Sequence, residues 1–409
     1  MSEWKEVIAT DFCVEVTDGT HDSPKPVSKG RYLLTSKHLQ EYQLDFANAY
    51  QISQEDYEKA IARSKVDQYD VLFSMIGTIG ITHRVSMAKV DFAVKNMGIF
   101  KMGGDEIKSM WLYYWLKTRK AKEYINSTLS GTTQGYITLK ALRNFPIQVP
   151  NEGLMKSITS FLSSLDDKIA VNRRICENLE AQAQALFKHW FIDFAPFKNG
   201  NFVESELGMI PEGWRVGKLG DYCKVKSGFA FKSSMWTEKG CPVIKIKNIT
   251  NSGRIDMTDC SYISKQNVAK AKAFKANRGD LVIAMTGATI GKFSILPQFD
   301  DETYINQRVG KFFLGNNPLE KLPYVFCLLS DNRNRKQLTT MGQGSAQPNI
   351  SGSDIESIIA VYSNNVIESF NEICYPMFDM ILTKQEENLR LSTLRDTLLP
   401  KLMSGQIKV

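Results

Sequence analysis

The segment of this chain closest to a nucleotide-binding loop is Gly287-Ala-Thr-Ile-Gly291-Lys292. A phosphate-binding P-loop needs four residues between its glycines and a serine or threonine after its lysine, because backbone amides and that hydroxyl hold the phosphates and Mg²⁺. Here only three residues separate the glycines, and Phe293 stands where the hydroxyl is needed. We therefore expect no nucleotide site at this turn.

Other side chains with catalytic or metal-binding chemistry are few and scattered. The four histidines are far apart, and the sequence contains neither a His-Glu-x-x-His zinc motif nor a Gly-x-Ser-x-Gly nucleophile motif. The tetrapeptide usual in adenine methyltransferases, an Asn-Pro-Pro or Asp-Pro-Pro with an aromatic neighbour, is also missing. Seven cysteines without a Cys-x-x-Cys pair indicate reduced thiols that pack as small apolar side chains. The sequence favours a binding protein with no catalytic residue and no metal or cofactor of its own.

The overall composition of the 409 residues is that of a globular protein, with 43% hydrophobic and 23% charged residues. A net charge of +7 permits a nucleic-acid partner but does not require one. The first residues lack the cationic flank and apolar run of a signal peptide, and no apolar stretch is long enough for a membrane span. We expect a cytoplasmic protein.

The chain repeats itself at an offset of about half its length. Asp70-Val-Leu-Phe-Ser-Met75 aligns with Asp280-Leu-Val-Ile-Ala-Met285, 210 residues later, and His38 aligns with Asn248 at the same offset. A catalytic histidine should not be replaceable by asparagine, whereas a hydrogen-bonding one is. Further pairs at the same or a nearly constant offset are Trp4 and Trp214, Asn96 and Asn306, and Gln134 and Gln347. A protein that grips two similar objects needs this arrangement, and a single active site rarely does.

Each half ends in a segment whose apolar residues are spaced alternately three and four residues apart, as in a coiled coil. In the first half these residues are Met155, Ile158, Leu162, Leu165, Ile169, Asn172, Cys176, Leu179, Ala183, Leu186 and Trp190. In the second they are Phe370, Ile373, Met377, Met380, Lys384, Glu387, Leu391, Leu394 and Leu398.

Both seams are polar at the centre. We predict an antiparallel coiled coil in which Asn172 faces Lys384 or Glu387 and fixes the register; the alternative is that each helix packs only on its own globule. Pro376 should start or kink the second helix, and Pro400 should end it.

The predicted fold is a mixed α/β (α+β) chain of two similar globules, each followed by a long helix. Short runs of β-branched residues mark strands, and Met110–Tyr124 and Leu322–Lys336 mark helices. The predicted boundaries are residues 1–151 for the first globule, 152–192 for its helix, 193–213 for a turn-rich linker, 214–363 for the second globule and 364–409 for the second helix and tail.

The motifs together resemble the specificity subunits of type I restriction-modification systems over essentially the whole chain. The similar segments are Asp18-Gly-Thr-His21, Leu165-Asp-Asp-Lys-Ile169, Glu206-Leu-Gly-Met-Ile-Pro-Glu-Gly-Trp214, Lys226-Ser-Gly-Phe-Ala-Phe-Lys232, Asn306-Gln-Arg-Val-Gly310 and Leu398-Leu-Pro-Lys-Leu402. The resemblance implies that each globule reads one half of a split, asymmetric DNA site and that the helices set the spacing between the halves. It also implies as partners two methyltransferase subunits, which bind S-adenosylmethionine and methylate adenine N6, and restriction-translocation subunits.

If the globules read DNA, polar and cationic side chains in their loops should contact base edges and phosphates. In the first globule the candidates are Thr20, His21, Lys25, Lys37, His38, Thr78 and Gln134. In the second they are Lys226, Ser227, Phe231, Lys232, Lys247, Asn248, Thr286, Thr289, Lys292, Asn306, Gln307, Arg308, Gln343, Ser345, Gln347 and Asn349. For each, a solvated or purely structural role is the alternative. Two other readings of the whole chain stay open, namely a self-sufficient DNA-modifying enzyme and a scaffold that bridges proteins through its coiled coil.

Overall fold

The computed structural model describes residues 4–40, 43–131, 135–250, 252–341 and 348–407. By its contacts the chain divides into two compact units, residues 1–170 with 391–409 and residues 171–390. The long helices α6 (Glu152–Phe187) and α10 (Asn364–Met403) each contribute one part to each unit. Their first residues coincide with the predicted boundaries at 152 and 364.

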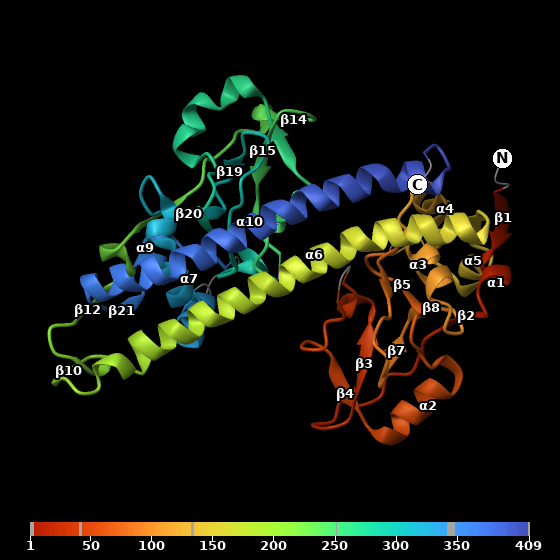
Figure 1. Ribbon diagram of the computed structural model, residues 1–409, viewed down its shortest axis with the longest axis horizontal. Coiled ribbons are helices and arrows are strands. Elements are labelled where there is room, and N and C mark those ends of the chain that lie inside the picture. Colours follow the sequence, from red (N-terminus) through yellow and green to blue (C-terminus); the bar gives the residue numbers. More distant parts are fainter. Residues whose placement is uncertain (1–3, 41–42, 132–134, 251, 342–347, 408–409) are drawn as a thin grey trace. The chain divides into compact units, whose positions relative to one another are not determined.

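The first unit contains a globule that we call lobe 1, residues 4–151 (Figure 1). Its strands are β1 (Lys5–Ile8), β2 (Glu15–Asp18), β3 (Arg31–Thr35), β4 (Tyr50–Ile52), β5 (Val71–Ser74), β6 (Thr82–Arg84), β7 (Phe92–Lys95), β8 (Met97–Lys101) and β9 (Pro146–Val149). Its helices are α1 (Ala9–Phe12), α2 (Gln54–Ser64), α3 (Glu106–Trp115), α4 (Arg119–Ser127) and α5 (Leu139–Arg143).

The second unit contains lobe 2, residues 214–363, and before it the hairpin of β10 (Phe202–Ser205) and β11 (Gly208–Pro211). The strands of lobe 2 are β12 (Arg215–Lys218), β13 (Lys224–Ser227), β14 (Trp236–Thr237), β15 (Cys241–Ile244), β16 (Ser261–Ile263), β17 (Leu281–Ala284), β18 (Phe293–Ile295), β19 (Tyr304–Ile305), β20 (Val309–Phe313) and β21 (Ile359–Tyr362). Its helices are α7 (Leu322–Ser330), α8 (Asn332–Met341) and α9 (Gly352–Glu356).

The two lobes share one topology, as the repeat predicts. A four-stranded antiparallel sheet has the order β2-β8-β5-β6 in lobe 1 and β13-β20-β17-β18 in lobe 2. Each lobe also has a mixed sheet whose parallel pair is β3 with β7 or β15 with β19; it has the order β4-β3-β7 in lobe 1 and gains a strand in lobe 2, with the order β14-β16-β15-β19. An outer antiparallel pair, β1 with β9 or β12 with β21, precedes the long helix.

In each antiparallel sheet the inner strand β5 or β17 is buried on both faces. In β17, Leu281 and Ile283 join the core that includes the long helices, whereas Val282 and Ala284 join a second core deeper in the lobe. Side chains of a strand alternate between faces, so a continuous apolar run is required when both faces are covered.

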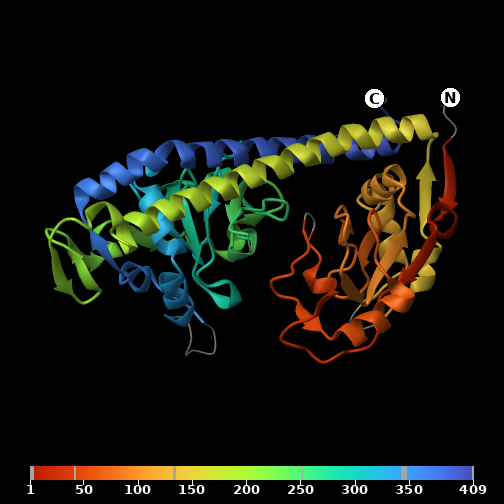
Figure 2. The same cartoon turned by 60° about the horizontal axis from the view of Figure 1, so that its bottom comes forward.

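The long helices pair in antiparallel fashion within each unit. In the second unit, Asn172 contacts Asn388, Cys176 contacts the carbonyl of Ile381, and the rings of Phe187 and Phe370 lie 6.0 Å apart. Figures 1 and 2 show the ribbons of α6 and α10 running side by side in this unit. In the first unit, Arg395 donates to Asp166 at 2.6 Å. The predicted antiparallel pairing is therefore present.

The seam predicted for the second helix is wrong by one residue. Ile373, Met380 and Leu394 are 46%, 44% and 45% exposed, whereas Cys374 and Ile381 are fully buried. The seam instead runs through Cys374, Phe378, Ile381, Gln385, Asn388, Ser392, Arg395, Leu399 and Leu402, with the same alternating spacing. Asn172 accordingly meets Asn388, and Lys384 and Glu387 pair with each other at 2.9 Å.

The helices also differ from the prediction at two prolines and in two segments of the lobes. Pro376 lies inside α10, between the buried residues Cys374 and Phe378, and Pro400 lies in the last turn. The segments 110–124 and 322–336 are each split between two helices, because Thr118 and Asp331 accept backbone hydrogen bonds that start α4 and α8. Among the described residues, no helix is both long and apolar enough to cross a membrane.

Candidate nucleic-acid interface

In lobe 2, five loop segments that are distant in sequence meet where the strands end. The amide of Gln307 donates to the carbonyl of Phe229, which follows β13, and the amide of Met285, which follows β17, donates to the carbonyl of Arg308. The amide of Ile350 donates in turn to the carbonyl of Met285. We call this meeting point edge 2, made of residues 227–229, 244–245, 285–287, 306–308 and 348–350.

Lobe 1 has the equivalent meeting point, made of residues 19–21, 35–36, 75–76, 96 and 136–137, which we call edge 1. The amide of Thr20 donates to the carbonyl of Val94, and the amide of Asn96 donates to the carbonyl of Thr20. Ile137 donates its amide to Met75, as Ile350 does to Met285 in lobe 2. The same hydrogen bonds therefore build both edges.

Edge 2 carries several of the predicted DNA-contacting residues with their side chains exposed: Ser227, Gln307, Arg308 and Asn349. Thr286 also belongs to it, half-buried. Next to these, the ammonium group of Lys245 lies 3.8 Å from the ring centroid of Trp236, and burial lowers the pKa of this lysine. The edge thus offers amide, hydroxyl and cationic groups, which are the groups that recognise base edges and phosphates.

Edge 1 offers a different set of groups. His21, with a side chain 65% exposed, contacts Asn96 at 2.8 Å and Asp18 at 3.0 Å. Asn96 itself has a positive φ of 53°. The exposed residues Ile76 and Tyr136 face each other in an isolated antiparallel bridge between two loop segments. Sequence reasoning missed Asn96 and Tyr136 as candidates, although the alignment of Asn96 with Asn306 was a signal that could have found the first.

Other predicted residues lie outside the two edges. Lys25 and Lys37 in lobe 1 are exposed, as are Thr78, Lys226, Lys232 and Lys247. Lys247 pairs with Asp259 at 2.6 Å. Thr289 and Lys292 are half-buried in the turn after β17, where the Thr289 hydroxyl donates to the carbonyl of Thr286. Gln134, Gln343, Ser345 and Gln347 lie outside the described residues.

Four predicted residues are buried in structural roles. Phe231 is 7% exposed and packs against Phe229 and Trp236 in a small core, and Asn306 is 6% exposed in the turn that builds edge 2. His38 and Asn248 are 1% and 2% exposed. Their predicted role in DNA contact is wrong, because no base can reach a side chain enclosed in this way.

The roles of His38 and Asn248 are equivalent. The backbone amide of Thr35 donates to Nδ1 of His38 at 2.9 Å, and that of Lys245 donates to Oδ1 of Asn248 at 2.9 Å. Each side chain thus caps a one-turn helix, Ser36–His38 or Ile246–Asn248. Because Nδ1 must accept, the proton of His38 sits on Nε2, facing the carbonyl of Asn48 at 3.2 Å. Burial lowers the pKa of His38.

A buried ion pair, also missed at the sequence level, recurs in both lobes. Lys311 contacts Asp280 at 2.6 Å, with both side chains less than 10% exposed, and Lys101 contacts Asp70 at 2.6 Å. The two carboxylates also accept the amides of Asn277 and Asp67. Burial nevertheless raises the pKa of both aspartates. The pairs anchor the loops before β5 and β17.

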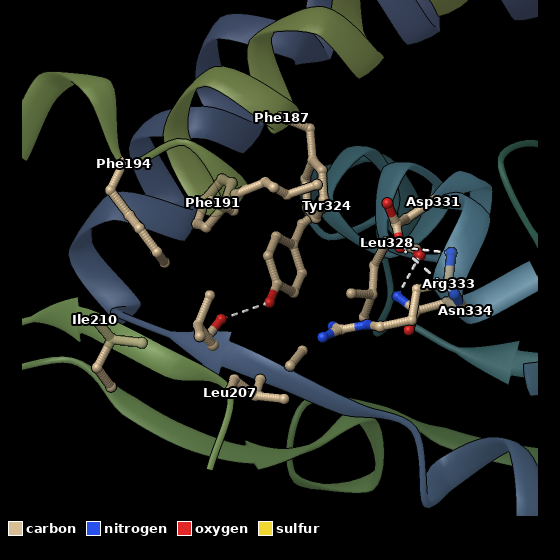
Figure 3. A pocket seen from close by; sticks show the side chains of 13 residues that line it. Phe187, Phe191, Phe194, Leu207, Ile210, Tyr324, Leu328, Asp331, Arg333 and Asn334 are labelled. Atoms are coloured by element: carbon tan, nitrogen blue, oxygen red, sulfur yellow. Dashed lines mark hydrogen bonds between the residues drawn. The ribbon is translucent and has the colours of Figure 1, made fainter. Parts of the chain in front are cut away.

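A cavity of about 230 Å³ lies in the second unit at the end of α6 (Figure 3). It is lined by aromatic rings such as Phe187, Phe191 and Tyr324, with Arg333 beside them, and by none of the predicted DNA-contacting residues. The described residues hold no group of three or more His, Cys, Asp or Glu side chains that could bind a metal ion.

Comparison with known proteins agrees with the tandem arrangement. A family model described as "Type I restriction modification DNA specificity domain" matches residues 25–181 and again 211–359. The chain is 30% identical to the type I restriction enzyme MjaIX specificity subunit of Methanocaldococcus jannaschii, over 89% of this chain and 85% of the relative. It is 27% identical to the MjaVIII specificity subunit of the same organism, over 73% and 70%.

The fold also matches a solved structure. The crystal structure of a type I restriction-modification S subunit from M. genitalium aligns with a TM-score of 0.51 and 16% identity, over 98% of this chain and 96% of that one. The double match of the family model covers most of the chain: the first match spans most of lobe 1 and of α6, and the second spans most of lobe 2 and ends before α10. This chain belongs to the type I restriction modification DNA specificity domain family.

Proposed function

We propose that this chain is the specificity subunit of a type I restriction-modification complex, in which each lobe reads one half of a split, asymmetric DNA site. The observation that carries the proposal is that the family model matches twice, on two lobes with the same topology. In each lobe the same loop segments converge on one edge with different exposed side chains. Two edges of the same design and different chemistry suit two half-sites of different sequence.

The groups at the edges match the known chemistry of base recognition. Arginine pairs bidentately with guanine, and glutamine or asparagine with adenine, so Arg308, Gln307 and Asn349 are the candidates for direct readout in lobe 2. His21 and Tyr136 are the candidates in lobe 1. Exposed lysines outside the edges, such as Lys232, would contact phosphates, which position the protein without specifying sequence.

The rest of the complex would supply the chemistry. In this proposal the chain is not an enzyme: the paired helices dock two methyltransferase subunits, which bind S-adenosylmethionine and methylate adenine N6 in both half-sites. Restriction-translocation subunits would join the same complex. The long helices continue through both units, which gives them the length to act as a spacer between the lobes.

Methylome sequencing of the host with and without the gene tests this proposal. We expect one bipartite motif with methylated adenine in each half to disappear on deletion. Gel shifts with the assembled complex should show preference for that motif over competitor DNA, and the purified chain alone should neither methylate nor cleave. An unchanged methylome together with no sequence preference would refute the proposal, and turnover by the chain alone would favour an enzyme.

A further inference from the structure

Arg278, in the turn before β17, holds lobe 2 to helix α10 through several hydrogen bonds. Its Nε donates to Glu386 at 2.7 Å and its Nη1 donates to Asp379 at 2.7 Å. Nη2 donates to the carbonyl of Asp379 and to the hydroxyl of Thr383, both at 3.3 Å. The guanidinium group therefore spans two turns of the helix, and an arginine in such a fork is held in direction as well as in distance.

The lobe is tied to the helices at further points around this arginine. Glu386 also accepts the backbone amide of Gln298 at 3.1 Å, so one carboxylate receives two segments of the lobe. On the other helix, Arg254 pairs with Glu180 at 2.9 Å. The side chains of the Arg254–Glu180 pair and of the Arg278–Glu386 pair are all less than 30% exposed. Solvent and salt therefore weaken these two pairs less than they weaken a surface pair.

The backbone of Arg278 is rigidly joined to edge 2. Asp280 accepts the amide of Asn277 at 2.8 Å, and Gly279, at a φ of 85°, donates its amide to Leu296. The strand β17 then runs directly from this turn to Met285 in edge 2. At about 3.3 Å per residue the distance is roughly 20 Å, and all four residues of β17, which lie between, are buried. A rotation of the lobe at Arg278 must therefore displace edge 2.

Lobe 1 differs at this position. The repeat aligns Arg278 with Gln68, which is 210 residues earlier and whose amide group donates to the carbonyl of Ser86 within its own lobe. The rest of the turn is the same, because Asp70 accepts the amide of Asp67 and Tyr69 has a positive φ of 69°, as Gly279 does. The arginine clamp is thus an addition to lobe 2 and no requirement of the shared fold.

We propose that Arg278 is a positioning residue that fixes the orientation of edge 2 on the helices and thereby sets how strictly the complex discriminates the spacer length of its DNA site. The inference rests on the proposed function. The clamp touches no predicted DNA-contacting residue, so its loss should leave the contacts to each half-site intact and relax their spacing.

The test uses the assembled complex and DNA duplexes that carry both half-sites with the native spacer or with one base pair more or fewer. For Arg278→Gln, which introduces the residue of lobe 1, we expect the ratio of affinities for native over altered spacers to fall roughly tenfold, a change of about 1.4 kcal/mol. Asp379→Asn should lower the ratio less, and Arg278→Lys should restore part of it. The matched control is Lys275→Gln, which removes the same charge and breaks the Lys275–Glu302 pair inside the lobe.

The outcomes separate the two claims. An unchanged ratio in Arg278→Gln, or an equal loss of affinity for all spacers, would overturn the positioning role while leaving the proposed function in place. The same fall in Lys275→Gln would assign the effect to charge alone and would also overturn it. If the unaltered complex shows no preference for any bipartite site, the proposed function fails, and the inference fails with it. Unfolding midpoints of all variants verify that lobe 2 remains folded.

Discussion

His38 and Asn248 perform one capping task with two chemistries, and only one of them can be protonated. The pKa of His38 is lowered from its ordinary 6.5, and that of the buried His83 is lowered to about 4. Below pH 6.5 the unfolded chain therefore binds protons more readily than the folded one, and the free energy of unfolding falls as the pH falls. His38→Asn introduces the residue that caps the equivalent helix in lobe 2. The variant should therefore keep the cap and remove the part of the low-pH loss of unfolding free energy that comes from His38.

Urea unfolding of the first unit's tryptophan signal at pH 7.5 and pH 5.5 measures the effect. At pH 7.5 we expect the free energies of unfolding of the parent chain and of His38→Asn to differ by less than about 1 kcal/mol, since a cap contributes about that much. At pH 5.5 the variant should be the more stable. His189→Asn removes an exposed histidine outside the cap and serves as the control. An identical pH dependence in His38→Asn would show that the cap does not depend on the neutral ring.

The buried pair of Lys311 and Asp280 predicts a large asymmetry between single and double substitutions. Lys311→Met leaves the Asp280 carboxylate buried without its cation, which should cost about 3–5 kcal/mol of unfolding free energy. Adding Asp280→Asn removes the charge and keeps an acceptor for the amide of Asn277, so the double variant should recover much of that loss. Denaturant unfolding of both variants measures the difference. Equal destabilisation would mean that packing of the lysine chain, and not its charge, holds the loop.

Arg308 and Lys232 predict a change in the salt dependence of DNA binding. Each cation that contacts a phosphate releases counterions, so Arg308→Ala or Lys232→Ala should weaken binding and reduce the slope of log K against log salt by about one unit. Asn349→Ala, at the same edge but uncharged, should alter base preference and leave the slope unchanged. Titrations of the assembled complex at several salt concentrations give the slopes. Unaltered slopes in both cationic variants would place those side chains away from phosphates.

At the scale of single elements, the sequence predicted the first long helix better than the second, for a physical reason. In α6 the apolar residues form one stripe, and Ile158, Leu162 and Ile169 are buried as predicted. In α10 two neighbouring stripes are apolar, one through Ile373 and Met380 and one through Cys374 and Ile381. Spacing alone cannot choose between them, because the choice is made by contacts with α6 and with lobe 2.

The same reason explains the mixed outcome for the loop residues. Strands, turns and the repeat follow from local patterns, and these were predictable. Whether a loop side chain such as His38 or Phe231 is enclosed or exposed depends on segments far away in sequence, and no local pattern records it. The alignment of His38 with Asn248 identified a shared hydrogen-bonding role. In the structure both side chains do form the same hydrogen bond, but their partner is a backbone amide and not DNA.

The contact of Asn172 with Asn388 predicts that the polar centre of the helix pair fixes the register of α6 against α10 and does not increase the stability of the pair. Asn172 is fully buried, its amide donates to Asn388 at 2.9 Å, and its Oδ1 has no hydrogen-bond partner among the described groups. Replacing both residues by leucine removes that unsatisfied atom and should raise the unfolding midpoint by several degrees. The expected cost is specificity, seen as oligomers in light scattering. A lower midpoint would show that the asparagine pair stabilises the helices.

At the scale of the whole molecule, the continuity of α6 and α10 through both units predicts that helix length sets the DNA spacer. Seven residues inserted after Ala170 in α6 and after Arg390 in α10 fall at the boundary between the units. The insertion adds about 10.5 Å at ~1.5 Å per residue and preserves the heptad seam. At ~3.4 Å per base pair, the preferred spacer should lengthen by on the order of three base pairs.

Selection from a DNA library with the two half-sites fixed and all spacer lengths represented measures this shift. Insertion into α6 alone provides the control. The seven added residues have no counterpart in α10, so the seam is out of register on one side of the insertion. Stable pairing of the helices and tight binding to DNA of any spacer length should then both be lost. The double insertion should instead fold like the parent and select longer sites. Retention of the native spacer by the double variant would mean that the lobes adjust their separation independently of the helices, which would remove the spacer role from α6 and α10.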